Sequence, residues 1–371
     1  MLGLIEAVEL RLISMPLVHP FETSFMRETD KDCILVRALG SGLEGWGEVV
    51  AMPEPLYNEE TIATCWHMLV DFLIPKTLRR AWKDPGEWAQ AMRPLRRNYM
   101  AKAGLEGALW DLYSQVQGKS LAQLWGGRRS RVPVGVSLGI EASMPELLAQ
   151  VEQAVEAGYR RIKLKIKPTW DVAVVREVRR LYPQIQLQVD ANSAYTLDDV
   201  EVFRAMEDLD LLLIEQPLAH DDIIDHATLQ GQLATAICLD ESIHSRDDCR
   251  KALQLQACRI INIKPGRVGG FCESLRIHEL CQSHGVPVWC GGMLETGVGR
   301  LQNLALASLD GFTLPGDLSA SARYFREDII DPPVTLESDG CVVVPTHVGL
   351  GGRLDLSRVE HYCQKMELIA K

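Results

Sequence analysis

Five charged residues recur at almost constant spacing through the middle of the chain, and together they could carry acid–base chemistry. The set consists of Lys165, Asp190, Glu215, Asp240 and Lys264, whose consecutive members are 25, 25, 25 and 24 residues apart. Three carboxylates that face one cavity would repel one another, and a divalent cation would remove that repulsion. Oxygen donors of this kind suit Mg²⁺, with Mn²⁺ or another divalent cation as alternatives. The other interpretation is a structural network in which the acids pair with lysines.

The elements that must position these residues follow from an alternation of short apolar strands and helical segments. From about residue 131 onward, strand-like segments such as RIKLKIK (161–167), LQVDAN (187–192) and LLLIEQP (211–217) alternate with helical patterns. This alternation predicts a parallel sheet covered by helices, and eight such strands fit a (β/α)7β TIM-like barrel. Each interval corresponds to one strand–helix unit, so we expect the five charged residues at the C-terminal mouth of the barrel, where enzymes of this fold place their chemistry.

The segment RIKLKIK brings two further lysines to the same strand. Strict alternation puts Lys163, Lys165 and Lys167 on one face, and in a barrel this face points toward the axis. An ordinary lysine has a pKa of about 10.4, which is too high for a base at neutral pH. A metal, a second ammonium group and partial burial would all lower the pKa of a lysine in the mouth toward a useful value.

The flanking regions predict a second domain. Residues 1–125 hold strand-like stretches followed by helical ones, as in an α+β capping domain, whereas residues 126–320 form the barrel. Residues 321–371 are expected to return to the capping domain and complete it. The strand pattern GCVVVPTHVG (340–349) is our candidate for that return. No low-complexity linker separates the two domains, so we expect them to pack tightly.

Composition and charge narrow the classes of function. The 371 residues carry a formal net charge of −11, which argues against binding to nucleic acid or to an anionic membrane. The 10 cysteines are scattered without a C-x-x-C pair, as expected for reduced thiols in a cytoplasmic protein. The N-terminal segment lacks the apolar region of a signal peptide, and no run approaches the roughly 18 apolar residues of a membrane span. We therefore expect a soluble, cytoplasmic homo-oligomer that acts on a small molecule.

A set of motifs spread along nearly the whole chain carries a family resemblance. The motifs are RIKLKIKP, LQVDANSAYT, LLLIEQPLA, ICLDESI, INIKPGRVGG and VPVWCGGMLETGVGR, with PLVHPFETSF and WGEVVAMPEPLYNEE near the N-terminus. They resemble the enolase superfamily, in its muconate-lactonizing-enzyme-like subgroup. Within it, they are most similar to o-succinylbenzoate synthases and N-acylamino acid (N-succinylamino acid) racemases. Sites of this superfamily use a lysine or histidine base together with Mg²⁺.

The resemblance implies a role for each charged residue. The metal ligands would be Asp190, Glu215 and Asp240. Lys163 and Lys165 would form the K-x-K pair of the superfamily, with Lys165 as the base, because Pro168 closes the strand and leaves Lys167 at the outer rim. Lys264 would be the opposing lysine, on the other face of a bound small-molecule carboxylate.

The resemblance also suggests residues that support this centre. Asn192 and Glu241 would orient the lysine and the metal ligands. Arg267, three residues after Lys264, either tunes the pKa of that lysine or is a surface arginine. Two loops of the capping domain would exclude water and contact the remote part of the substrate, together with barrel residues at strand ends. The substrate-binding candidates are Phe21, Phe25, Met52, Tyr57, Ser137, Gly292, Met293 and Leu294, with His19 and Leu56 as further loop candidates.

These roles imply Mg²⁺-dependent removal of the proton alpha to a carboxylate, through an enediolate. The principal interpretation is a lyase that dehydrates 2-succinyl-6-hydroxy-2,4-cyclohexadiene-1-carboxylate to o-succinylbenzoate for menaquinone biosynthesis. The alternative is an N-acylamino acid racemase, and one site could support both reactions. A muconate cycloisomerase remains open, and a dipeptide epimerase ranks lower because PGDLS offers only Asp317 to hold an ammonium group.

Other classes are less well supported. A metal-free aldolase would use Lys264 as a Schiff-base lysine. A non-catalytic binding barrel would have to keep an uncompensated acid–lysine cluster in one cavity. The segment GVSLG (135–139) matches the G-x-S-x-G pattern of hydrolases, but no helix begins at its serine.

Overall fold

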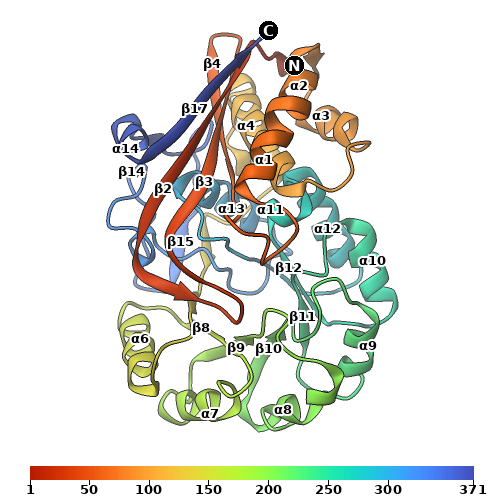
Figure 1. Ribbon diagram of the computed structural model, residues 1–371, viewed down its shortest axis with the longest axis vertical. Coiled ribbons are helices and arrows are strands. Elements are labelled where there is room, and N and C mark those ends of the chain that lie inside the picture. The colour runs from red at the N-terminus through yellow and green to blue at the C-terminus, as the bar shows by residue number, and fades with distance from the viewer.

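A parallel barrel and an antiparallel cap make up the computed structural model, which describes residues 1–371 (Figure 1). The barrel contains a seven-stranded parallel sheet in which sequence neighbours are also spatial neighbours. Its strands are β7 (Val136–Leu138), β8 (Arg161–Lys165), β9 (Gln186–Asp190), β10 (Leu211–Glu215), β11 (Ile237–Leu239), β12 (Ile260–Ile263) and β13 (Val288–Cys290). The predicted fold class, a (β/α)7β barrel with an α+β cap, is confirmed.

The eighth position of the barrel is filled by residues 312–316, which form single bridges instead of a regular strand. Phe312 bridges in parallel to Val288 of β13, and Gly316 bridges in parallel to Val134 just before β7. The amide of Gly135 also donates to the carbonyl of Gly316 at 2.8 Å. These contacts close the ring between its first and last strands.

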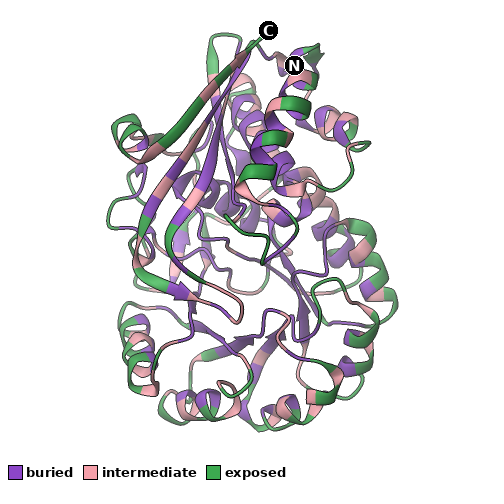
Figure 2. Cartoon of the chain, in the orientation of Figure 1, coloured by how far each residue is buried: buried purple, intermediate pink, exposed green.

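Helices cover the outside of the barrel, and most of them bury the face toward the strands and expose the other (Figure 2), whereas the helix of residues 297–307 is buried on all sides. In α7, for example, Val174, Val175 and Val178 are buried, whereas Arg179 and Arg180 lie in the last turn, where cations are favoured. The helices are α6 (Met144–Glu156), α7 (Val172–Leu181), α8 (Val200–Arg204), α9 (Ile224–Gln230), α10 (Arg246–Gln254), α11 (Pro265–Val268), α12 (Phe271–Ser283) and α13 (Gly297–Ala307). Every strand end at the mouth is thus held between packed layers.

The cap is built on a four-stranded antiparallel sheet with the order β17-β2-β3-β4. Its strands are β2 (Ala7–Glu22), β3 (Arg27–Gly40), β4 (Leu43–Val49) and β17 (Cys363–Ala370). The helices that follow are α1 (Ile62–Met68), α2 (Ile74–Leu78), α3 (Pro85–Met92), α4 (Tyr99–Gln117) and α5 (Leu121–Trp125). Helix α4 packs so closely on β4 that a Cβ at Gly47 would collide with the carbonyl of Gly104, so glycine is required at this position.

The C-terminal segment completes the cap, but not through the strand that the sequence suggested. Within 340–349, β15 (Cys341–Val343) pairs with β6 (Arg131–Pro133) beside the barrel, so that assignment is wrong. The return is made by β17, which pairs with β2 and lies next to it in Figure 1. Both faces of β17 mix polar and apolar residues, and Met366 and Leu368 are exposed, so no alternation of buried apolar and exposed polar residues predicted a strand.

The remaining elements are short. They are β1 (Gly3–Leu4) paired with β5 (Ala81–Trp82), β14 (Ile330–Asp331) paired with β16 (Arg353–Leu354), and α14 (Leu356–Tyr362) before β17. A π-helical turn, η1 (Leu69–Leu73), joins α1 to α2, and the 3-10 turns are η2 (Leu197–Asp199), η3 (Glu207–Leu209) and η4 (Ser321–Arg323). None of the helices combines the length and the apolar character that crossing a membrane requires.

Candidate active site

The predicted acids and lysines lie at the C-terminal ends of successive barrel strands. Lys165 on β8 is in register with Asp190 on β9, and Asp190 is in register with Glu215 on β10. Asp240 and Lys264 directly follow β11 and β12. Since three acid-bearing strands separate β8 from β12, Lys165 and Lys264 approach the mouth from different sides.

On the β8 side, two lysines bond to the first two acids. The ammonium of Lys165 lies 2.7 Å from Asp190 Oδ2 and 2.5 Å from Asn192 Oδ1. The ammonium of Lys163 lies 2.9 Å from Glu215 Oε2, 3.1 Å from Asp190 Oδ2 and 2.7 Å from Asp317 Oδ2. Lys163 therefore bridges three carboxylates, whereas Lys165 contacts one.

On the β12 side, Asp240 is shared by two cations and a tyrosine. Lys264 Nζ lies 2.6 Å from Asp240 Oδ2, and Arg267 donates through Nη1 to Asp240 Oδ1. Tyr57, which comes from the cap, donates to Asp240 Oδ1 at 3.3 Å and accepts from Lys264 at 3.3 Å. Arg267 is fully buried and also donates to the carbonyls of Ile243 and Asn262, so the alternative of a surface arginine is wrong.

Two polar residues hold the acids and lysines in place. Asn192, which accepts from Lys165, donates through Nδ2 to Glu241 Oε1 at 2.8 Å. Asn262, which the sequence analysis missed, donates to Glu215 Oε1 at 2.7 Å. Asn262 precedes Lys264 by two residues on β12, so strand alternation could have placed it on the inward face.

The ionisable groups of the mouth have strongly shifted pKa values. Burial lowers the pKa of Lys165, and Asp190 only partly opposes this shift. Burial also acts against the charge of Lys163, but Asp317, Glu215 and Asp190 outweigh it and raise its pKa. Burial likewise acts against the charge of Lys264, but Tyr57 and three nearby carboxylates (Glu215, Glu241 and Asp190) outweigh it and raise its pKa. Of the three buried lysines, Lys165 is thus the one that loses its proton most readily.

A small cavity of about 50 Å³ lies between the barrel mouth and the cap. Lys163, Lys165, Lys264 and Asn192 line it, together with all eight substrate-binding candidates: Phe21, Phe25, Met52, Tyr57, Ser137, Gly292, Met293 and Leu294. Pockets for small ligands usually measure about 300–1,000 Å³, so the cap loops have to move outward to admit a substrate. The structure therefore describes a closed arrangement.

Three other candidates lie outside this cavity. His19 lines a separate cavity on the outer side of the first loop, and Leu56 is exposed to solvent. Lys167 lies at the rim, where it pairs with Glu22 at 3.2 Å. The first K-x-K pair, Lys163 and Lys165, is thus the one that faces the cavity.

The cavity also contains residues that the sequence analysis missed as substrate contacts. Thr23, Glu28 and Tyr324 line it, and so does Asp317. Asp317 is held by Arg161 at 2.6 Å and by Lys163, which together lower its pKa to about 2 against the effect of burial. No periodic pattern marks Thr23, Tyr324 or Glu28; along β3 the next residue on the face of Glu28, Asp30, is exposed.

Comparison with known families agrees with this geometry. The N-terminal domain family of mandelate racemase and muconate lactonizing enzyme matches residues 7–126, and the enolase C-terminal domain-like family matches residues 146–358. The chain belongs to the enolase superfamily.

Individual relatives within the superfamily match over nearly their whole length. The chain is 53% identical to an o-succinylbenzoate synthase of Geobacillus stearothermophilus, over 97% of this chain and 96% of the relative. It is 49% identical to an N-succinylamino acid racemase of Thermus thermophilus, over 96% of each chain. A crystal structure of an enolase-superfamily member from Listeria innocua superposes with a TM-score of 0.95 at 40% identity, covering 99% of each chain.

The carboxylate oxygens at the barrel mouth suit a divalent cation, although in this structure they bond to lysine ammonium groups instead. No three His, Cys, Asp or Glu side chains are arranged to hold a metal ion as they stand. Lys163 lies between Asp190 and Glu215, so two carboxylate oxygens already converge on one positive charge. Nearby, Glu241 Oε2 is buried without a partner, and burial raises the pKa of Glu241 to about 7, with Asp190 adding to the shift. The buried carboxylates of the mouth are therefore donors that suit a divalent cation, and one of them, Glu241, keeps an oxygen without a partner.

Proposed function

We propose that this protein dehydrates 2-succinyl-6-hydroxy-2,4-cyclohexadiene-1-carboxylate to o-succinylbenzoate and water, as in menaquinone biosynthesis. The observation that carries the proposal is the pair Lys165 and Lys264 on different sides of three strand-end carboxylates. The similarity to o-succinylbenzoate synthases, 53% over nearly the whole chain, supports the choice of substrate.

Lys165 and Lys264 would have different roles in this reaction. Lys165, the lysine with the lowered pKa, takes the proton from the carbon next to the substrate carboxylate. The electron pair of that C–H bond moves toward the carboxylate. Protonated Lys165 then returns the proton to the leaving hydroxyl group, so that the C–O bond breaks and water forms. Lys264, whose pKa is raised, stays charged and stabilises the negative charge from the other side.

Asp190, Glu215 and Asp240 would hold Mg²⁺ or another divalent cation. When bound, that ion supplies a Lewis acid that stabilises the charge developing on the substrate carboxylate. Asn192 and Glu241 keep the acid cluster and Lys165 in fixed relative positions. Phe21, one of the cap residues in contact with the mouth, lies with its ring centroid 6.0 Å from Lys165 Nζ and helps to exclude water.

Steady-state dehydration by two matched variants tests this proposal. Lys165→Met should lower kcat by about 10²–10⁴-fold, because the general base is lost. Lys167→Met removes a lysine from the same face of the same segment. It breaks only the half-exposed ion pair with Glu22 at the rim, so it should lower kcat at most about fivefold. Equal losses in the two variants, or no dehydration by the wild type, would contradict the proposal.

Racemisation of N-succinylamino acids is the second candidate function. It is favoured by the position of Lys264, which could exchange a proton on the face opposite Lys165, and by the 49% identity to an N-succinylamino acid racemase. In D₂O, Lys264→Arg should abolish α-proton exchange for one enantiomer and leave it for the other. Exchange of both enantiomers at wild-type rates would show that Lys264 is not the second base.

A further inference from the structure

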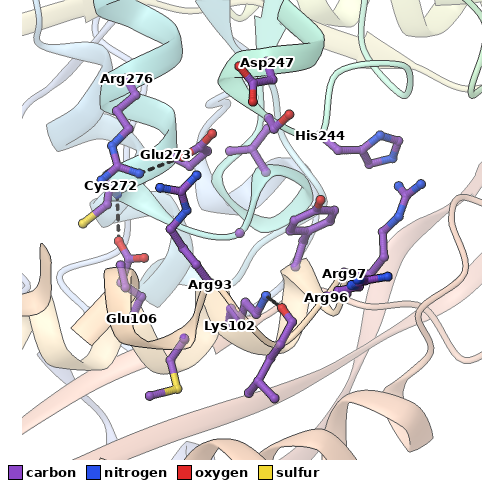
Figure 3. A pocket seen from close by; sticks show the side chains of 17 residues that line it. Arg93, Arg96, Arg97, Lys102, Glu106, His244, Asp247, Cys272, Glu273 and Arg276 are labelled. Carbon is purple, nitrogen blue, oxygen red and sulfur yellow. Dashed lines mark hydrogen bonds and ion pairs between the residues drawn. The ribbon is translucent and has the colours of Figure 1, made fainter. Parts of the chain in front are cut away.

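A second cavity, of about 440 Å³, lies at the junction of cap and barrel and is separate from the active site (Figure 3). One wall is formed by the end of α3, the loop 93–98 and the start of α4. The other wall is formed by the starts of α10 and α12 and by the end of α11. The volume lies within the usual range of small-molecule pockets.

The cap wall of this cavity carries cations without carboxylate partners. Arg96 makes no side-chain hydrogen bond or ion pair, and Arg93 only reaches Gln90 Oε1 at 3.4 Å. Lys102 is only 9% exposed, yet its ammonium bonds to a single group, the carbonyl of Leu95. An ammonium has three donors, so this buried lysine retains donors for a further partner.

The acids of the cavity do not neutralise these cations. Glu106 accepts from the amide of Cys272 at 2.7 Å and from Trp110 Nε1 at 3.0 Å. Glu273 accepts from the amide of Arg246 at 2.8 Å and pairs with Arg276 at 3.1 Å (Figure 3). Asp247 pairs with Arg250 at 3.8 Å. Each carboxylate thus has its own partner, away from Arg93 and Arg96.

Backbone conformation holds the arginine loop against the cavity. Arg97 and Asn98 both have left-handed backbone conformations, with φ of 53° and 54°, which are uncommon for residues other than glycine. Asn98 Nδ2 donates to the carbonyl of Arg96 at 2.9 Å and fixes the turn. Consecutive strained residues of this kind cluster at ligand sites.

Helix ends add to the positive potential. Helices α4, α10 and α12 all begin at this cavity, so the positive ends of three helix dipoles converge there. The chain as a whole has a net charge of −11, so a basic cavity contrasts with the charge of the rest of the protein. The cations of the cavity and the helix dipoles both favour an anionic ligand.

We propose that this interdomain cavity binds a small multivalent oxyanion, either phosphorylated or polycarboxylic, through Arg93, Arg96 and Lys102. Guanidinium forks match phosphate and carboxylate oxygens, and the buried ammonium supplies a point charge at the base of the cavity. A ligand held in this way contacts only cap residues with its charged end, while the starts of α10 and α12 face it from the barrel.

Calorimetric titration of the Mg²⁺-loaded protein tests the site, with inorganic phosphate and citrate as probes at constant ionic strength and constant free Mg²⁺. We expect saturable binding of at least one probe, weakened at least about tenfold in Arg93→Ser/Arg96→Ser. Tighter phosphate binding identifies a phosphorylated ligand, and tighter citrate binding identifies a polycarboxylate. Arg128→Ser, which removes an exposed arginine elsewhere, should bind like the wild type.

Thermal unfolding gives an independent measurement. A probe at about a hundredfold excess over its Kd should raise the Tm of the wild type by about 3–5 °C, and should raise the Tm of Lys102→Met much less. The absence of saturable binding to the wild type, or binding of equal strength to Arg93→Ser/Arg96→Ser, would overturn the proposal.

Discussion

Replacing Tyr57 by phenylalanine is expected to weaken the contact between the cap and the catalytic mouth while both domains stay folded. Tyr57 is only 5% exposed, and its hydroxyl is the cap group that bonds to both Asp240 and Lys264. Asp240 and Lys264 keep their direct contact at 2.6 Å when the hydroxyl is removed, so neither is left as an isolated buried charge. Tyr57→Phe therefore deletes two hydrogen bonds and little else.

The size of the effect follows from the length of these bonds. Both measure 3.3 Å, which is longer than typical O–H···O and N–H···O bonds, so each belongs to the weaker part of the usual range. Two such bonds contribute about 1–2 kcal/mol in total. If they form only when the cap closes on the substrate, kcat/KM for dehydration should fall by about 5- to 30-fold.

Steady-state kinetics with a matched control checks this prediction. Tyr182→Phe removes a hydroxyl that makes no hydrogen bond, on the far side of the barrel at the end of α7, and should leave kcat/KM unchanged. A fall of less than about twofold in Tyr57→Phe would show that the cap does not close through this contact. A fall above about 100-fold would show that the hydroxyl takes part in proton transfer, contrary to our reasoning.

Three further predictions concern metal dependence and stability. Chelation with EDTA should abolish dehydration and added Mg²⁺ should restore it, whereas activity that survives chelation would favour a metal-free mechanism. Glu48→Gln should lower the free energy of unfolding by about 2 kcal/mol in urea titrations. Glu48 accepts from Thr296, the N-cap residue of α13, and from Gly299 in its first turn, and an amide would oppose one of these donors. Burial raises the pKa of Glu106 from its ordinary 4.5 to about 7, so the folded state holds this proton more tightly and stability should fall, by up to about 3 kcal/mol, as pH rises from 4.5 to 7. Glu106→Gln keeps the acceptor for Cys272 and should make that fall smaller without abolishing it, because burial also raises the pKa values of Glu48, Asp111 and Glu241 to about 7. An unchanged slope would contradict the assignment.

The spacing of charged residues correctly predicted that the site residues lie at the same end of successive barrel strands. A repeat of 25 residues is a property of one strand–helix unit, and the register of Lys165 with Asp190 and of Asp190 with Glu215 shows that the unit repeats without a shift at this end of the sheet. The return of the chain to the cap was less predictable. Strand β17 is an edge strand with an exposed outer face, so pairing with β2, not apolar periodicity, determines its structure.

The partners of each charge could not be predicted from the sequence. The acids pair with lysines as the side chains stand, and the choice between Lys163 and a metal ion for the space between Asp190 and Glu215 depends on side-chain rotation. Thr23 and Tyr324 come to the cavity only through the docking of the cap and of the segment after the barrel. Contacts of this kind are set by tertiary packing, which leaves no local signal.

The two lysines of the proposed reaction have different electrostatic surroundings, and this difference bears on which reaction the site performs. Lys165 bonds to one carboxylate and one neutral amide, and burial keeps its pKa low. Burial acts against the charge of Lys264, but Tyr57 and the carboxylates of Glu215, Glu241 and Asp190 outweigh it and raise its pKa, which suits a group that stays charged. Dehydration needs one neutral base, whereas racemisation needs a neutral lysine on each face in turn. Arg267 does not contact Lys264 but bonds to the other oxygen of Asp240, so it influences that lysine by sharing its acid. The rate of racemisation should therefore depend on how far other cations, such as Arg267, neutralise Asp240. The rate of dehydration by Lys165 should not depend on it.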